Sequence, residues 1–86
     1  MKNHRILGVH ITQRVKHVPK VQQVFTEYGC FIRTRLGLHE ASEATCSPNG
    51  LILLELAGEE AKGQELTRRL REIEGVDVKE MAFEHP

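Results

Sequence analysis

One polar segment gathers most of the side chains in this sequence that could bind a metal ion. A histidine, two glutamates and a cysteine lie within eight residues: His39, Glu40, Glu43 and Cys46. Imidazole and thiolate suit Zn, Ni or Cu, and a carboxylate can complete the coordination shell. The spacing matches no strong metal signature, so the simpler interpretation is a solvated connection with an incidental thiol. A transition-metal site is the alternative, and a symmetric oligomer would favour it by joining two half-sites.

Three further polar residues are candidates on predicted strands. His10 lies mid-strand, where it could be a metal ligand contributed across subunits, although packing at an interface is its more ordinary role. Arg33 and Arg35 alternate on one strand and could hold a carboxylate or phosphate ligand. Cross-strand ion pairing with an acid such as Glu55 is the interpretation we favour for these two arginines.

The connection from the first strand to the first helix is locally basic. It carries Arg14, Lys16 and His17. The N–H groups at the start of a helix add donors for an anion. The sequence therefore predicts either a small anionic ligand at this connection or a solvated basic loop.

Neither catalysis nor nucleic-acid binding finds support in the sequence. There is no Gly-x-Ser-x-Gly, no Gly-rich phosphate loop and no His-Glu-x-x-His. Cys46 and His39 could be named nucleophile and base, but only their proximity in a loop would favour that pairing. The 12 basic and 12 acidic residues cancel, and Phe31 alone is placed for base stacking. We expect a non-enzymatic protein that does not bind nucleic acid directly.

Alternating apolar residues predict the strands that must position these side chains. The four predicted strands are His4–Thr12, Cys30–Leu38, Gly50–Ala57 and Val76–Phe83. In the second strand the predicted buried face is Cys30, Ile32, Thr34, Leu36 and Leu38, with Arg33 and Arg35 on the other face. The eleven residues His39–Asn49 form a polar loop.

Helical spacing of apolar residues predicts two helices between the strands. The first begins near Pro19, after a polar crossing at Gln13–His17, and Gly29 stops it in a left-handed cap. Glu59 and Glu60 open the second helix, and Gly75 ends it.

The order of these elements, βαββαβ, is the ferredoxin-like pattern. We therefore expect one α+β domain over residues 1–86, with a four-stranded antiparallel sheet and both helices on one face. The uncovered face would mix apolar and charged side chains, which suits a subunit interface. A domain this small is marginal alone, so a homo-oligomer is expected.

The two cysteines do not make a disulfide framework, and Cys30 is predicted to be a small core residue. No signal peptide is apparent, and the apolar run Leu51–Leu54 is too short to span a membrane. These features predict a cytoplasmic protein.

The whole chain resembles the small stand-alone ACT-like proteins described as regulators of the iron-only hydrogenase system. The motifs that carry the resemblance are Glu27-Tyr28-Gly29, Arg35-Leu36-Gly37-Leu38, Asn49-Gly50 and the set Leu70, Ile73, Gly75 and Val76. This resemblance implies a regulatory module in such a system. It would act as a homodimer or homotetramer that responds to a small ligand or a protein partner.

The same fold is similar to the metal-sensing C-terminal domain of nickel-responsive repressors. That domain binds metal through histidines on a strand and a cysteine shortly after it. The chain carries Arg33 and Arg35 where two alternating histidines would stand, and His39 precedes Cys46 by seven residues. The resemblance implies transition-metal binding by His39 and Cys46 as the alternative function, with His10 contributed by a neighbouring subunit. The carboxylate of Glu43 is the ligand that would complete this coordination shell.

Overall fold

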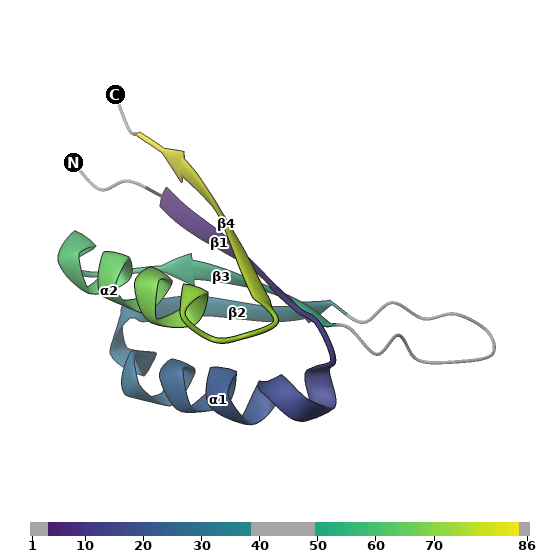
Figure 1. Cartoon of the computed structure of the whole chain (residues 1–86). Coiled ribbons are helices and arrows are strands. Elements are labelled where there is room, and N and C mark those ends of the chain that lie inside the picture. The colour runs from purple at the N-terminus through teal and green to yellow at the C-terminus, as the bar shows by residue number, and fades with distance from the viewer. Residues whose placement is uncertain (1–3, 39–49, 85–86) are drawn as a thin grey trace.

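The structure of the protein is a computed structural model that describes residues 4–38 and 50–84. Its elements follow the predicted order (Figure 1). They are β1 (His4–Ile11), α1 (Arg14–Glu27), a short 3₁₀ helix η1 (Gly29–Phe31), β2 (Ile32–Leu38), β3 (Gly50–Leu56), α2 (Glu60–Arg71) and β4 (Val76–Phe83).

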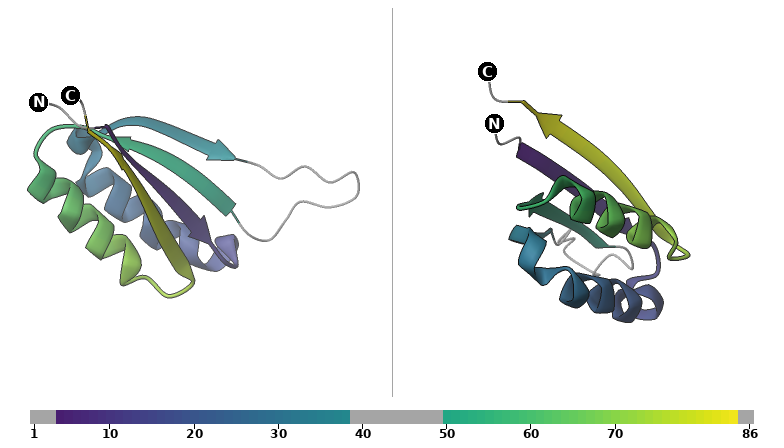
Figure 2. Two further views of the ribbon diagram at one scale, coloured as in Figure 1. Left: turned by 90° about the horizontal axis from the view of Figure 1, so that it is seen from above. Right: turned by 90° about the vertical axis from the view of Figure 1, so that its left-hand side faces the viewer.

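The four strands form one antiparallel sheet in the order β2-β3-β1-β4. Both helices pack on the same face of this sheet and leave the other face uncovered (Figure 2). The predicted ferredoxin-like α+β fold is therefore confirmed. Neither helix in the described part of the chain is long and apolar enough to cross a membrane.

The core lies between the sheet and the two helices. Alternate residues of β1 and β3 point into it, as the sequence pattern predicts. Its fully buried side chains are Leu7, Val9, Ile11, Val21, Leu54, Leu66 and Leu70. One set of alternating strand residues points into the core. The other set therefore lies on the face of the sheet that the helices leave uncovered, which we call the open face.

The first helix differs from the prediction at both ends. It begins at Arg14, so most of the predicted polar crossing is helical and Pro19 lies inside the helix. Gln13 precedes it in a left-handed conformation with φ of 51°. Gly29 does not cap the helix with a positive φ; it opens η1 instead. The spacing of apolar residues did not indicate where α1 begins, because the first turn of the helix is mostly polar.

The second strand contains the largest departure from the predicted pattern. Its register against β3 shifts between Ile32 and Thr34, so Thr34 lies opposite Glu55 and Arg35 lies opposite the buried Leu54. One extra residue in a strand inverts the faces of all residues beyond it. Arg35 is therefore on the helix-covered side, and Leu36 is on the open side with 52% of its surface exposed.

Cys30 is exposed in η1 rather than buried in a strand, so its prediction as a core residue was wrong. The strand begins at Ile32, two residues later than predicted. The helix therefore continues into a 3₁₀ turn before the chain becomes extended.

Candidate interface on the open face of the sheet

The open face of the sheet carries three large apolar side chains that are about half exposed. Leu36, Met81 and Phe83 are 52%, 54% and 55% exposed. The strand registers place further aliphatic side chains on the same face, namely Ile6, Leu51 and Leu53. Clustered exposed apolar residues of this kind mark interaction surfaces in soluble proteins.

A polar network centred on Glu55 interrupts this apolar face. The Nδ1 atom of His4 lies 3.2 Å from Oε2 of Glu55, and the hydroxyl of Thr34 donates to Oε1 at 3.1 Å. Arg33 completes the network with an ion pair of 3.9 Å, which confirms the predicted Arg33–Glu55 pairing. The hydrogen bonds from His4 and Thr34, followed by the charge of Arg33, lower the pKa of Glu55. Glu55 is therefore held as a carboxylate.

Charges of both signs flank the apolar residues at the β1–β4 side of the face. The register puts His10 opposite Asp77, and Lys79 opposite Gly8. His10 is exposed on this face, where the sequence predicts it. Since the face carries acids and bases together, two copies can pair it with opposite charges aligned.

The two predicted arginines are not brought together. Arg33 reaches Glu55 on the open face, whereas the guanidinium of Arg35 lies 4.8 Å from the centre of the Phe25 ring on the helix side. The prediction that both share one face was wrong, because the register shift lies between Ile32 and Thr34. They do not form a joint site for a carboxylate.

The three predicted basic residues at the start of α1 also differ in their surroundings. Arg14 opens the helix, Lys16 is exposed, and His17 is 7% exposed with its ring against Gly75. The backbone N–H groups of Lys16 and His17 donate to the carbonyl of Gln13 at 2.9 and 3.3 Å. These two donors are therefore already used, and a ligand role for the three basic residues stays a prediction.

The predicted metal site falls largely outside the described residues. His39, Glu43 and Cys46 lie in the range 39–49, and only His10 is placed. Within residues 4–38 and 50–84, no three His, Cys, Asp or Glu side chains gather closely enough to hold a metal ion. Metal binding by His39 and Cys46 stays a prediction.

Sequence reasoning missed Met81 and Phe83 as residues of the open face. The signal was available in β4, where Val76 and Val78 alternate with charged residues and place position 81 on the other face. The Arg5–Glu80 pair on the helix side was also missed, since those residues stand at opposite ends of the chain.

No protein-family model matches the sequence, and no curated protein sequence matches it. The structure is similar to that of an uncharacterized protein, TM1266 from Thermotoga maritima, with a TM-score of 0.80 and 23% identity over 96% of this chain and 100% of that one. It is also similar to CPII, a nitrogen regulatory PII-like protein from Thiomonas intermedia K12 bound to ADP, AMP and bicarbonate. That match has a TM-score of 0.56 and 12% identity, covering 99% and 97% of the two chains.

A third similar structure is a formyltetrahydrofolate deformylase from Pseudomonas putida KT2440. The TM-score is 0.56 at 13% identity, and the match covers 91% of this chain but 28% of that one. These structural similarities support the assignment of the ferredoxin-like fold. The same arrangement of helices and strands thus occurs in a regulatory protein and in part of an enzyme, so the fold alone does not determine a function.

Proposed function

We propose that this chain is a non-enzymatic regulatory module that works as a homo-oligomer and assembles through the open face of its sheet. The observation that carries the proposal is the set of three half-exposed apolar side chains on that face, Leu36, Met81 and Phe83. Burying them against a second copy removes apolar surface from water, which is the main driving force of association.

The chemistry of the face suits a copy of itself. Apolar residues occupy several strands, and charged residues of both signs accompany them, including Glu55, Asp77 and Lys79. Interfaces typically combine an apolar centre with polar groups at the rim. The equal numbers of acidic and basic residues in the chain leave little net repulsion between copies.

A regulatory role is supported by two observations of different kinds. The fold is shared with a PII-like nitrogen regulatory protein that binds ADP, AMP and bicarbonate. The sequence motifs resemble those of ACT-like regulators of the iron-only hydrogenase system. We therefore assign the module to the cytoplasm and to such a system, where a small ligand or a protein partner would shift its assembly by binding one state better than another.

Co-production with an iron-only hydrogenase and its maturation enzymes tests the functional part of this proposal. Hydrogen evolution per amount of hydrogenase protein should change when the wild-type chain is present. The Met81→Glu variant should lose the effect, because it places a charge in the proposed interface. An activity that is the same with wild type, with Met81→Glu and with no added chain would contradict the role in a hydrogenase system.

A further inference from the structure

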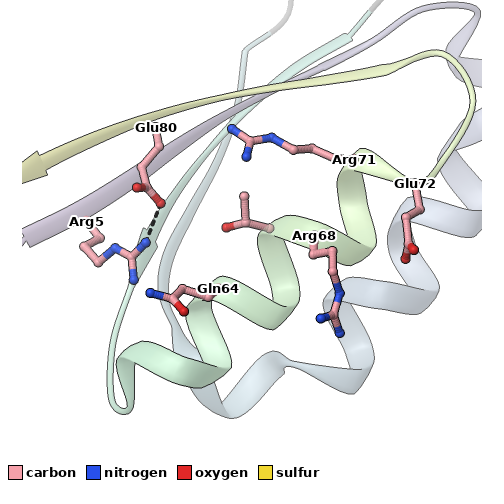
Figure 3. A pocket seen from close by; sticks show the side chains of 7 residues that line it. Arg5, Gln64, Arg68, Arg71, Glu72 and Glu80 are labelled. Atoms are coloured by element: carbon pink, nitrogen blue, oxygen red, sulfur yellow. Dashed lines mark hydrogen bonds and ion pairs between the residues drawn. The ribbon is translucent and has the colours of Figure 1, made fainter.

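A groove of about 390 Å³ lies on the other side of the sheet, between α2 and the strands β1 and β4 (Figure 3). Its lining residues include Arg5, Gln64, Thr67, Arg68, Arg71 and Glu80. Small-molecule sites have volumes of about 300–1,000 Å³, so the groove is large enough for a compact metabolite.

A partly buried arginine forms one wall of the groove. Arg5 lies on the helix side of β1, in alternation with the fully buried Leu7, and its side chain is 14% exposed. Its Nη2 donates to Glu80 at 2.6 Å, and its Nη1 lies 3.5 Å from the carbonyl of Glu60. The carboxylate of Glu60 is 3.7 Å away but 69% exposed, so solvent screens it. These partners hold the guanidinium in place while leaving other N–H groups of Arg5 available.

A second guanidinium approaches from the end of α2. Arg71 extends toward the strands in Figure 3, and its Nη2 donates to the carbonyl of Val78 at 3.1 Å. That carbonyl is neutral, and Arg71 has no carboxylate partner among the residues that the structure describes. The charge of Arg68, one turn earlier, contributes to lowering the pKa of Glu65, after the Tyr28 hydrogen bond and Lys62. Arg71 is therefore the cation at the groove that has no carboxylate of its own among the described residues.

Neither of the two glutamates that line the groove forms an ion pair with Arg71. Glu80 is committed to Arg5, and Glu72 points away from the strands at the far end of α2 (Figure 3). Thr67 also lines the groove, and its buried hydroxyl already donates to the carbonyl of Gly63 at 2.8 Å. A ligand there would meet guanidinium donors and the amide of Gln64, which are groups that bind oxyanions.

We propose that this groove binds a small non-aromatic oxyanion, a carboxylate or phosphate compound, with Arg71 as the anchoring cation. The planar fork of Arg71 can hold two oxygens of either group at once. No aromatic side chain is among the lining residues, so the groove gives a nucleotide base nothing to stack on. Binding at this groove does not depend on the proposed function; only its regulatory consequence rests on that function.

Titration of ¹⁵N-labelled wild-type protein with inorganic phosphate, and separately with succinate, tests the proposal. We expect saturable amide shifts around residues 64–72 and 78–81 with at least one of the two anions. The anion that binds more tightly identifies the group that the groove prefers. Glycerol, a neutral compound of similar size, should cause no saturable shift.

Two arginine variants and a control locate the site. Arg71→Gln should weaken binding by about tenfold or more, because it removes a charge-assisted contact. Arg71→Lys should restore part of the affinity, since it keeps the charge and loses the fork. Arg33→Gln, on the open face, should bind as the wild type does. Absence of saturable shifts with both anions, or equal affinity in Arg71→Gln and wild type, would overturn the proposal. These readouts report binding directly, so a chain that does not assemble would still show whether the groove binds an anion.

Discussion

Glu80 and Met81 are consecutive residues of β4 whose side chains leave the sheet on opposite faces. Glu80 lies opposite the buried Leu7 and lines the groove, whereas Met81 lies opposite Ile6 and is 54% exposed on the open face. One edge strand therefore belongs both to the proposed anion site and to the proposed interface. A ligand that binds in the groove and orders β4 changes the conformational entropy that β4 loses when its open face is buried in the interface.

The first prediction is that anion binding strengthens self-association. The dissociation constant of the oligomer, measured by analytical ultracentrifugation, should fall when the better-binding anion of phosphate and succinate is added. Linkage requires the anion to bind the oligomer more tightly than the monomer by a matching factor. The Arg71→Gln variant should assemble with a constant that the anion does not change. An equal effect of the anion on the wild type and on Arg71→Gln would show that anion binding in the groove does not control self-association.

The second prediction concerns the carboxylate of Glu55 on the open face. Its lowered pKa, caused first by the hydrogen bond from His4, means that the folded state binds a proton at Glu55 less readily than the unfolded state does. The Glu55 carboxylate therefore contributes to the free energy of unfolding. This contribution is fully present above the ordinary glutamate pKa and is lost as the pH falls through the lowered pKa of the folded state. Urea midpoints should therefore fall less steeply in Glu55→Gln than in wild type between neutral pH and about pH 3.

Glu74→Gln is the matched control for that experiment, since Glu74 is an exposed residue of the turn before β4. Its acid profile should follow that of the wild type. Parallel profiles for wild type and Glu55→Gln would show that the His4–Glu55 contact does not stabilise the fold.

The third prediction concerns the turn that brings Gly75 against His17. Gly75 has a φ of 80°, and a Cβ built there would lie 2.6 Å from Cδ2 of the buried His17. Gly75→Ala should lower the free energy of unfolding by about 1–3 kcal/mol, because it combines backbone strain with a steric overlap. Chemical denaturation at neutral pH measures the loss.

Gly29→Ala provides the comparison, since Gly29 lacks a positive φ and nothing lies within 4 Å of its built Cβ. It should change stability by less than about 0.5 kcal/mol. Combining Gly75→Ala with His17→Ala should cost less than the sum of the single changes, because the second removes the overlap. Strict additivity would show that the ring of His17 does not crowd position 75.

The fourth prediction concerns Arg35 and the Phe25 ring, which lie 4.8 Å apart. A double-mutant cycle with Arg35→Gln and Phe25→Leu should give a coupling energy of about 0.5–1 kcal/mol, the range for a cation–π pair whose cation is exposed to solvent. The parallel cycle with Arg33→Gln should give none, since Arg33 reaches Glu55 on the other face. Equal coupling in both cycles would contradict the register shift in β2.

The sequence allowed the fold and two strands to be predicted in detail because apolar residues occupy every second position on their buried faces. Leu7, Val9 and Ile11 in β1, and Leu54 and Leu56 in β3, repeat every second residue without interruption. In β2, one extra residue between Ile32 and Thr34 inverts the pattern, and the composition of a strand does not reveal such a shift. The arginine pair was therefore assigned to one face although the fold separates it.

The groove could not be predicted from the sequence for a different reason. Arg5 and Glu80 are 75 residues apart, and they meet because β1 and β4 are neighbours in the sheet. In the sequence, Arg71 is an ordinary basic residue near the end of a helix. Only the fold shows that it lies beside the carbonyl of Val78. Local spacing carries no information about such contacts.

The state of self-association tests the central claim most directly, by sedimentation equilibrium of the wild type, Met81→Glu and Gln23→Glu. Gln23 is exposed on α1, on the opposite side of the molecule, so its variant adds the same charge away from the open face. We predict that the wild type and Gln23→Glu form oligomers, whereas Met81→Glu sediments as a folded monomer of 9.8 kDa. A monomeric wild type, or a Met81→Glu variant that assembles as the wild type does, would contradict assembly through the open face.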